Sequence, residues 1–327
     1  MKKEKILITG ATGFIGSHLC ELFSSKNFNI VAFDRYNINN DSGWLSTNTL
    51  RKKNIKLVLG DVRDYDSVYN SMKGCTSVIH LAALIGIPYS YVSPLAYVKT
   101  NVEGTYNVLE AARNLKLKNV IITSTSEVYG SAKYLPIDER HSLNAQSPYA
   151  ASKIAADQLS LSYYKSFKLP VKIIRPFNTY GPRQSSRAII PTIVNQLLFK
   201  NKKEIYLGNV KPTRDFTYVS DTCEAFFKVF KNKKLFGEIV NVGTNTKISI
   251  KDLAYKISNI LKIKKKFIIS DQRKRPKKSE VENLQCDFKK IQKFTKWKKK
   301  TKLTIGLTKT IKWLNLNQSK YKKDYSI

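Results

Sequence analysis

Short apolar runs rich in β-branched residues recur through the first half of the chain and alternate with longer amphipathic segments. The apolar runs lie at 6–9, 30–33, 55–59, 78–81, 120–123 and 171–174, and helical patterns between them include 16–24, 102–114 and 149–166. Uniformly apolar strands that alternate with helices are typical of a parallel sheet covered on both faces. The pattern predicts an α/β fold with a doubly wound parallel sheet over residues 1–175.

The pattern changes after residue 175, where prolines separate shorter elements. These are Pro182, Pro191, Pro212 and Pro276. A chain of 327 residues is long enough for two domains. We expect a smaller α/β substrate-binding domain built from residues 176–215 and 244–327. The runs 216–219 and 238–242 read as strands that return to the first sheet, so that residues 216–243 belong to the first domain and the two domains interleave.

The composition is strongly basic, with 58 Lys and Arg against 24 Asp and Glu and a net charge of +34. Such a charge would suit an anionic partner such as nucleic acid. However, 47 of the 58 cations are lysines, and Asn and Ile are also abundant, which is typical of an A+T-rich genome. The densest basic runs, 262–266 and 289–300, are not interleaved with aromatic residues as in a base-stacking surface. We interpret them as solvated helix faces and expect no nucleic-acid partner.

Cysteine spacing and apolar content argue against several other classes of protein. The four cysteines form no CxxC pair and have no histidine at metal-ligand spacing, so neither a metal site nor a disulfide framework is predicted. The opening MKKEKILITG is interrupted by Glu4 and Lys5, and no apolar run approaches the roughly 18 residues that span a bilayer. We expect a cytoplasmic protein without a membrane partner.

The first predicted strand runs directly into the sequence T-G-A-T-G-F-I-G. Its three glycines suit a strand-to-helix turn that needs unusual backbone angles and lets the chain approach a pyrophosphate. The free N–H groups at the start of the helix then face the phosphates. This is the pattern of a dinucleotide-binding Rossmann domain. The expected cofactor contacts are Gly10, Thr12, Gly13, Phe14, Ile15 and Gly16.

Asp34 ends the second predicted strand, at the interval after Gly16 that suits a carboxylate bound to the adenosine ribose hydroxyls. A carboxylate would repel a 2′-phosphate, which favours NAD over NADP, although the neighbouring Arg35 could accept that phosphate. Asp61 and Val62 follow the third strand and are candidate adenine contacts. An aspartate in this loop could equally cap a helix.

The spacing Y-x-x-x-K places two side chains on one face of a helix, one turn apart. It occurs four times in the sequence, at 69/73, 129/133, 149/153 and 164/168. Position selects Tyr149 and Lys153, because this pair opens a helix after S-P and the preceding strand ends in T-S-T-S-E-V-Y-G. That polar cluster lies at the edge where doubly wound sheets bind ligands. The other three pairs read as ordinary surface helix.

These motifs together resemble the extended short-chain dehydrogenases that modify nucleotide sugars. The matching segments are TGATGFIG, HLAA at 80–83, Asn101, TSTSEVYG, SPYAASK, RPFNTYGPRQ at 175–184 and PTRDFTYVSD at 212–221. The resemblance implies further cofactor contacts from Leu81, Ala82, Ala83 and Asn101. It also implies a homodimer in which the helices 102–114 and 149–166 pair with their copies. We interpret His80, at the end of a buried strand, as a packed histidine rather than an acid or base.

The resemblance assigns a role to each candidate catalytic residue. Thr125 would hydrogen-bond the 4-hydroxyl of the sugar, Tyr149 would take its proton, and Lys153 would hold the nicotinamide ribose. A nearby ammonium is expected to lower the pKa of the tyrosine.

Asn178 and Arg214 would meet the sugar diphosphate, for which an arginine offers planar, charge-assisted hydrogen bonds. Arg183 is a further candidate substrate contact. It or Arg175 could instead brace the loop between the domains.

The family contains epimerases, decarboxylases and 4,6-dehydratases, which all begin by oxidising C4 of the sugar. Glu127 lies where dehydratases carry the base that removes the C5 proton. Ser126 replaces the aspartic acid with which dTDP-glucose dehydratases protonate the leaving C6 hydroxyl. The stretch RPKKSEV at 275–281 is similar to the R-P-x-E-V stretch of GDP-mannose dehydratases. It implies that Arg275 binds phosphate and Glu280 binds ribose, with a basic surface loop as the alternative.

The combination resembles the NAD-dependent 4,6-dehydratases for nucleotide-linked N-acetylglucosamine in legionaminic acid synthesis, with GDP- or UDP-N-acetylglucosamine as the substrate. A UDP-glucuronate decarboxylase and an NDP-sugar 4-epimerase are open alternatives. A non-catalytic Rossmann protein that senses dinucleotide or binds RNA is a more distant one.

Overall fold

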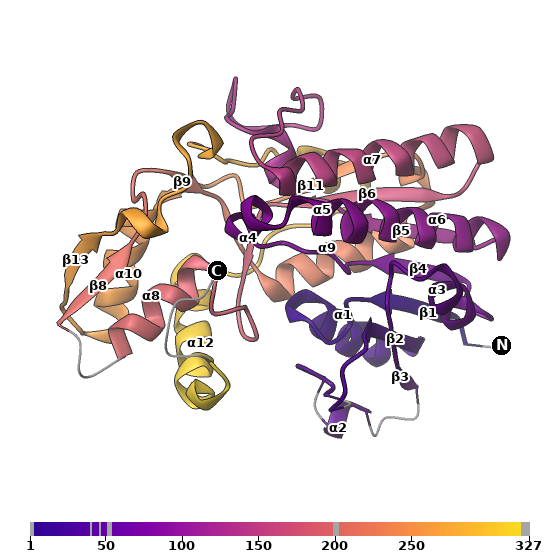
Figure 1. The fold of residues 1–327 in the computed structure, drawn as a ribbon, viewed down its shortest axis with the longest axis horizontal. Helices are drawn as coiled ribbons and strands as arrows, with labels where there is room; N and C mark the ends of the chain where they lie inside the picture. The colour runs from indigo at the N-terminus through magenta and orange to yellow at the C-terminus, as the bar shows by residue number, and fades with distance from the viewer. Residues whose placement is uncertain (1–2, 40, 46, 51–53, 199–202, 322–327) are drawn as a thin grey trace.

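A seven-stranded parallel sheet forms the centre of the computed structural model, which describes residues 3–321 apart from 40, 46, 51–53 and 199–202 (Figure 1). The strands, in their order across the sheet, are β11 (Ile239–Val242), β6 (Val171–Pro176), β5 (Asn119–Thr123), β4 (Ser77–His80), β1 (Lys5–Thr9), β2 (Asn29–Arg35) and β3 (Ile55–Gly60). The order runs outward from β1 in both directions, which is the topology of a doubly wound sheet. The predicted α/β fold is confirmed.

Helices cover both faces of this sheet. The helices of the first half are α1 (Phe14–Ser25), α2 (Thr47–Leu50), α3 (Tyr65–Met72), α4 (Ile87–Val92), α5 (Pro94–Tyr97), the π-helical segment η1 (Val98–Glu103), α6 (Gly104–Asn114), the 3-10 turn η2 (Ser126–Tyr129) and α7 (Pro148–Phe167). In Figure 1, α6 and α7 lie on one side of the sheet, and α1 lies on the other together with α9 (Val219–Lys231).

Alternate residues of the strands belong to two separate cores. Ile6 and Ile8 of β1 pack in one core with residues of α1 and α9, whereas Leu7 packs in the other with residues of α3 and α6. Successive side chains of a strand point to opposite faces, so both sets are buried here. This double burial explains why the strands are apolar at nearly every position.

The remaining elements belong mostly to residues 176–215 and 244–327. They are the helices α8 (Ile189–Leu198), α10 (Ile250–Leu261), α11 (Lys289–Thr295) and α12 (Leu303–Leu316), the 3-10 turns η3 (Lys233–Leu235), η4 (Asp271–Arg273), η5 (Lys277–Ser279) and η6 (Gln318–Lys320), and three two-stranded sheets. The sheets pair β7 (Asn178–Tyr180) with β10 (Phe216–Tyr218), β8 (Glu204–Leu207) with β13 (Lys266–Ile269), and β9 (Thr213–Arg214) with β12 (Ile248–Ser249). Buried residues of α8, α10 and α12 continue the core on the α1 and α9 face.

One of the two expected returns to the first sheet is wrong. Residues 239–242 do return, as β11, parallel to β6. Residues 216–218 form β10, which pairs instead with β7, and residue 219 already begins α9. The partner strand β7 directly follows β6 in the chain, so the β7–β10 pair continues beyond the end of β6 as a separate two-stranded sheet.

The densest lysine runs are solvated as expected, but the expected helix faces are mostly wrong, because only residues 289–295 of these runs lie in a helix, α11. Lys262, Lys264 and Lys266 are exposed where α10 leads into β13, and most lysines of the 289–300 run are exposed as well. All four cysteines are buried free thiols. Over the described ranges, the helices are too short or too polar to cross a membrane.

Candidate active site

The glycine-rich turn joins β1 to α1 at the carboxyl edge of the sheet, and its backbone tolerates no side chain at two positions. Gly10 has φ of +67°, and a Cβ there would lie 2.9 Å from the backbone nitrogen of Ala82. A Cβ on Gly16 would lie 2.0 Å from the carbonyl oxygen of Gly10. The turn is therefore a bare backbone cradle in front of the first N–H groups of α1. This geometry fits a pyrophosphate.

Asp34 lies against the same turn. Its Oδ2 accepts a hydrogen bond from the backbone N–H of Thr12 at 2.6 Å, and its Oδ1 accepts one from the N–H of Arg35 at 2.7 Å. The carboxylate is thus held beside the cradle, where the ribose of a bound dinucleotide would lie. The sequence-predicted pair of glycine turn and acidic residue is brought together, and its residues fit NAD.

The loop after β3 is only partly as expected. Asp61 forms an ion pair with Arg63 at 2.5 Å, and hydrogen bonds from Arg63 hold the pKa of Asp61 below its usual value. Asp64, not Asp61, caps α3 by accepting a hydrogen bond from the N–H of Asp66. Val62 is buried, and its carbonyl accepts a hydrogen bond from the Asn107 side chain at 2.9 Å. Asp61 and Val62 remain candidate adenine contacts.

The loop that follows β4 is tied to the first strand. The backbone N–H groups of Leu81 and Ala82 both donate to the Thr9 hydroxyl at 3.1 Å, and Ala83 is part-buried beside them. The two ring nitrogens of His80 lie 2.7 Å from the Thr9 hydroxyl and 3.2 Å from the Thr105 hydroxyl. Burial lowers the pKa of His80 to about 3, so the ring is neutral at pH 7. The structure supports a packed histidine.

Asn101 does not have the expected free side chain. It is buried in η1, its Oδ1 accepts from the N–H of Leu84 at 2.8 Å, and its Nδ2 donates to the Leu84 carbonyl and to the Ser152 hydroxyl. All of its polar atoms are therefore bonded to protein. Asn101 positions the loop 81–86 against α7 and remains a candidate cofactor contact.

Tyr149 and Lys153 occupy the start of α7. Ser147 caps this helix by accepting a hydrogen bond from the N–H of Ala150, and Pro148 is its first residue. Lys153 is buried, and its ammonium donates to the Thr123 carbonyl at 2.6 Å. Burial lowers the pKa of Lys153 to about 8, although the nearby Asp157 carboxylate acts in the opposite direction. The ammonium is thus fixed beneath the end of β5.

The expected direction of the Tyr149 pKa is wrong in this structure. Burial raises the pKa of Tyr149 above its usual value, and only a hydrogen bond with Thr125 counteracts this effect. The hydroxyl is desolvated, and removal from water disfavours the phenolate. The Lys153 ammonium, for its part, is engaged with the Thr123 carbonyl.

The T-S-E sequence forms a short 3-10 turn directly beside Tyr149. Thr125 caps η2, because its hydroxyl accepts a hydrogen bond from the Glu127 N–H at 3.2 Å. Thr125, Ser126 and Glu127 are all buried. The Glu127 carboxylate is close enough to Tyr149 to raise its pKa further. A hydroxyl, a phenol and a carboxylate therefore share one pocket wall, as the sequence predicts.

Two arginines and a second glutamate, all far from Glu127 in sequence, surround this carboxylate. Arg275 Nη1 lies 3.9 Å from Glu127 and 3.7 Å from Glu280, and Arg214 Nη2 lies 3.3 Å from Glu280. Arg275 Nη1 and Asn178 Oδ1 are buried atoms without a hydrogen-bond partner among the described residues. Such atoms suit a polar ligand. The fold thus brings Arg214, Arg275 and Glu280 together around Glu127, whereas the described contacts do not join Asn178 or Arg183 to this cluster.

Arg183 lies elsewhere. Its guanidinium forms an ion pair with Glu21 of α1 at 2.8 Å, and the neighbouring Pro182 carbonyl lies 3.1 Å from His18 Nε2. Arg183 therefore braces the loop after β7 against α1 through Nη2. Its Nη1 is buried without a hydrogen-bond partner among the described residues, so Arg183 remains a candidate substrate contact.

Arg175 forms a buried ion pair that joins β6 to α7. It is 1% exposed and its Nη2 lies 2.9 Å from the carboxylate of Asp157 on α7. Ser124 donates to the same carboxylate oxygen, and Arg175 Nη1 donates to the Tyr129 hydroxyl at the end of η2. Sequence reasoning missed Asp157. Its signal was available, because residues 149, 153 and 157 follow one another at i+4 spacing on one face of a largely buried helix.

A second missed group fixes the RPKKSEV segment onto the site. The Tyr91 hydroxyl lies 2.6 Å from the Ser279 hydroxyl, and the Ser279 hydroxyl donates to the Gln146 carbonyl. The Gln146 amide in turn donates to the carbonyls of Lys278 and Glu280. No sequence pattern marks these contacts, since their partners lie far apart in the chain. They anchor the segment, although Pro276, Lys277 and Lys278 are exposed, so both the nucleotide contact and the basic surface loop remain open.

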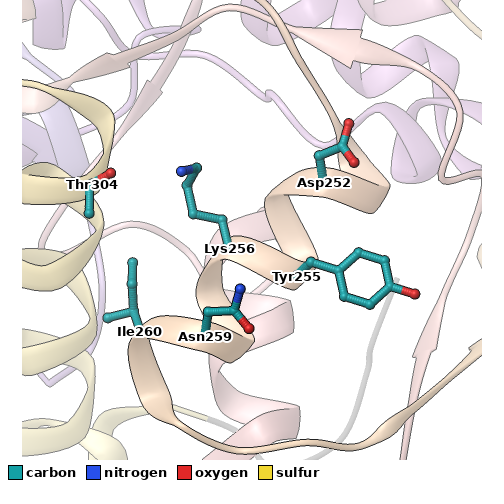
Figure 2. A pocket seen from close by; sticks show the side chains of 6 residues that line it. All are labelled: Asp252, Tyr255, Lys256, Asn259, Ile260 and Thr304. Atoms are coloured by element: carbon teal, nitrogen blue, oxygen red, sulfur yellow. The ribbon is translucent and has the colours of Figure 1, made fainter.

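A separate hollow of about 450 Å³ lies between α10 and α12 (Figure 2). Its lining residues are Asp252, Tyr255, Lys256, Asn259, Ile260 and Thr304. It shares no residue with the assembly at the sheet edge. The sheet-edge residues are the stronger candidate for the chemistry, because a dinucleotide cradle and the candidate Tyr149 and Lys153 pair meet there.

The fold and site define a class of protein: a dinucleotide-dependent enzyme of the extended short-chain dehydrogenase type. The family model described as GDP-mannose 4,6 dehydratase matches residues 7–310. The chain belongs to this family.

Relatives within the family carry out several reactions. The chain is 38% identical to a dTDP-D-glucose 4,6-dehydratase of Dictyostelium discoideum, over 79% of this chain and 62% of that protein. It is 31% identical to a putative UDP-glucose 4-epimerase of Methanocaldococcus jannaschii, over 95% of this chain and 99% of that protein. It is also 31% identical to a UDP-N-acetyl-alpha-D-glucosaminuronate decarboxylase of Bacillus cytotoxicus, over 95% and 98% of the two chains.

Solved structures agree with the fold. The X-ray structure of Pal from Bacillus thuringiensis superposes with a TM-score of 0.86 at 33% identity, covering 95% of this chain and 99% of that chain. DesIV, a dTDP-glucose 4,6-dehydratase from Streptomyces venezuelae with NAD and TYD bound, has a TM-score of 0.86 at 25% identity, covering 97% and 99%. The NAD in that structure agrees with the cofactor that the glycine turn and Asp34 predict.

Replacing Asp34 tests the cofactor site. We expect Asp34→Ala to weaken NAD binding by about tenfold to a hundredfold, because a carboxylate that accepts hydrogen bonds contributes about 1.5–3 kcal/mol. Discrimination against NADP should fall at the same time. Titration calorimetry with each nucleotide measures both effects, with Asp271→Ala, whose side chain is 90% exposed, as the control. Wild-type protein that prefers NADP would contradict the ribose assignment.

Proposed function

We propose that the protein is a nucleotide-sugar 4,6-dehydratase that converts UDP- or GDP-linked N-acetylglucosamine to its 4-keto-6-deoxy derivative. One observation carries the proposal: the Glu127 carboxylate lies beside Tyr149 and faces Arg275 at 3.9 Å. A dehydratase needs this carboxylate for elimination, whereas a simple 4-epimerase does not. Bound NAD would accept a hydride from C4 and return it to C6, and is regenerated in each cycle.

The first step belongs to Thr125, Tyr149 and Lys153. Tyr149 takes the proton of the sugar 4-hydroxyl as C4 is oxidised, and the Thr125 hydroxyl, close enough to influence the Tyr149 pKa, hydrogen-bonds the same sugar hydroxyl. Lys153, fixed by the Thr123 carbonyl, would hold the nicotinamide ribose and supply a positive charge near Tyr149. A tyrosine that is desolvated needs this support in order to ionise.

The second step is the elimination of water, and it involves Glu127 and Ser126. The new C4 ketone makes the C5 proton acidic, and Glu127 removes it. In the same turn Ser126 occupies the position of an acid that could protonate the leaving C6 hydroxyl, and a serine is a weak acid, so Glu127 also serves this step. Arg214 and Arg275 bind the diphosphate, and Glu280 binds the ribose of the nucleoside.

A UDP-glucuronate decarboxylase is the second candidate. Its support is the decarboxylase of Bacillus cytotoxicus among the relatives and the T-S-E sequence, which both reactions use. The C-terminal stretch favours the dehydratase, because RPKKSEV lacks the R-x-P-D pattern of the decarboxylases.

A mass-spectrometric screen of UDP-, GDP- and dTDP-sugars separates the reactions. We expect one N-acetylglucosamine nucleotide to lose the mass of water, because elimination across C5 and C6 precedes the return of the hydride. Loss of carbon dioxide from a glucuronate nucleotide would establish the decarboxylase instead. An unchanged mass with an inverted C4 would establish an epimerase, and either result would contradict the proposal.

Glu127→Gln separates the two chemical steps. The variant should keep C4 oxidation, since Tyr149 and Lys153 are intact, while elimination falls by a factor on the order of 10² or more, as for the loss of a positioned general base. NADH should therefore accumulate on the protein, and near-ultraviolet absorbance measures it. Tyr149→Phe should give no such signal, and Glu282→Gln, an exposed carboxylate, should behave as wild type. Undiminished C5 deuterium exchange in Glu127→Gln would remove Glu127 from the mechanism.

We also propose a two-fold dimer through the face formed by α6 and α7. Tyr106, Tyr164 and Phe167 expose 45%, 36% and 49% of their surface on these helices, although large apolar side chains favour burial. An isologous contact would bury both copies of this face at once. Light scattering at micromolar concentration should give the mass of a dimer, and Tyr106→Glu should lower it, whereas Ile269→Glu on β13 should not. A monomeric wild type would contradict the dimer.

A further inference from the structure

An aromatic cluster joins the C-terminal elements to the loop beside the dinucleotide site. Trp44 lies in the loop after β2, Trp313 lies in α12, and Tyr321 directly follows η6. The ring centroids lie 5.1 Å apart for Trp44 and Trp313, 6.1 Å for Trp44 and Tyr321, and 6.0 Å for Trp313 and Tyr321. Each ring contacts both of the others. We call these three residues the aromatic clasp.

The loop that carries Trp44 is bonded to the glycine-rich turn. The backbone N–H of Trp44 donates to the Thr12 carbonyl at 2.9 Å, and the N–H of Thr12 donates to Asp34 Oδ2 at 2.6 Å. Gly43 allows the close approach, because its φ is +54° and a Cβ there would lie 2.8 Å from the Thr12 carbonyl oxygen. Thr12 thus connects Trp44 directly with the carboxylate proposed to bind the adenosine ribose.

Tyr321 makes a second connection. Its hydroxyl donates to the Gln184 carbonyl at 2.8 Å. Gln184 follows Arg183, which is paired with Glu21 on α1, the helix that begins at the pyrophosphate cradle. The C-terminal elements are therefore linked to the cofactor-binding turn through Trp44, and to α1 indirectly through the loop that carries Gln184 and Arg183.

We propose that the aromatic clasp retains NAD by holding Thr12 and Asp34 in the geometry that binds its adenosine half. Trp44, Trp313 and Tyr321 are positioning residues, and the proposal rests on NAD binding at this site as proposed above. Aromatic rings at these separations attract one another beyond their buried area, and Lys320 adds a cation–π contact to Trp44 at 5.4 Å. Slow release suits a cofactor that is regenerated in every cycle.

The test measures the release of NAD rather than turnover. Wild type, Trp313→Ala and Tyr321→Ala are loaded with NAD and diluted into nucleotide-free buffer, and the release rate is followed. We expect both variants to release NAD about tenfold faster, since affinity changes at one site are expressed mainly in the dissociation rate. The double variant should be little faster than either single variant, because the two residues act as one unit. Trp313→Phe should restore most of the retention.

Matched variants separate retention from general stability. Leu316→Ala removes another apolar side chain of α12, 74% exposed and outside the clasp, and should release NAD as wild type does. Tyr321→Phe removes only the hydrogen bond to Gln184 and should fall between wild type and Tyr321→Ala. The unfolding midpoint of nucleotide-free Tyr321→Ala should match that of the wild type, so that faster release cannot follow from a damaged fold.

The outcomes distinguish the clasp from the cofactor site on which it depends. If wild type binds NAD and both alanine variants release it at the wild-type rate, the clasp is overturned and the cofactor site stands. If Leu316→Ala accelerates release as much as Trp313→Ala, the clasp is also overturned. If wild type binds no NAD, the cofactor site and the clasp fail together.

Discussion

The buried ion pair between Arg175 and Asp157 fixes the catalytic helix on the sheet, and much of the site depends on it. The two side chains are 1% and 0% exposed. Removing one partner from such a pair leaves a buried charge and costs about 3–5 kcal/mol. The pair joins β6 to the middle of α7, one helical turn beyond Lys153. It therefore fixes the position of Tyr149 and Lys153 relative to the carboxyl ends of the strands.

The same ion pair extends into a network that reaches the elimination site. Arg175 donates to the Tyr129 hydroxyl, and Tyr129 donates to Asn241 on β11 at 2.7 Å. Tyr129 is the last residue of the short turn that carries Glu127. The turn that carries Glu127 is thus anchored to the helix that carries Tyr149 and Lys153.

The residues proposed to bind the substrate come from segments that are far apart in the sequence and meet only in the folded chain. Arg214 lies on β9, which pairs antiparallel with β12. Arg275 and Glu280 lie on either side of η5. Hydrogen bonds from Gln146, which lies just before the catalytic helix, hold η5 in place. Opposite charges in this cluster are close but not fully hydrogen-bonded, as the buried Arg275 Nη1 shows. A polar ligand that pairs with this nitrogen would stabilise the arrangement.

The sequence by itself determined the doubly wound sheet, the glycine cradle, Asp34 and the Tyr149 and Lys153 face, because periodicity and short-range spacing control these features. It did not determine that residues 216–218 pair with β7, since strand pairing joins segments that are far apart in the sequence. It also did not show that Asn101 and Arg183 are bonded to protein, or that burial raises the pKa of Tyr149. Solvent exclusion and contacts between distant segments decide these points, and both arise only when the tertiary structure is complete.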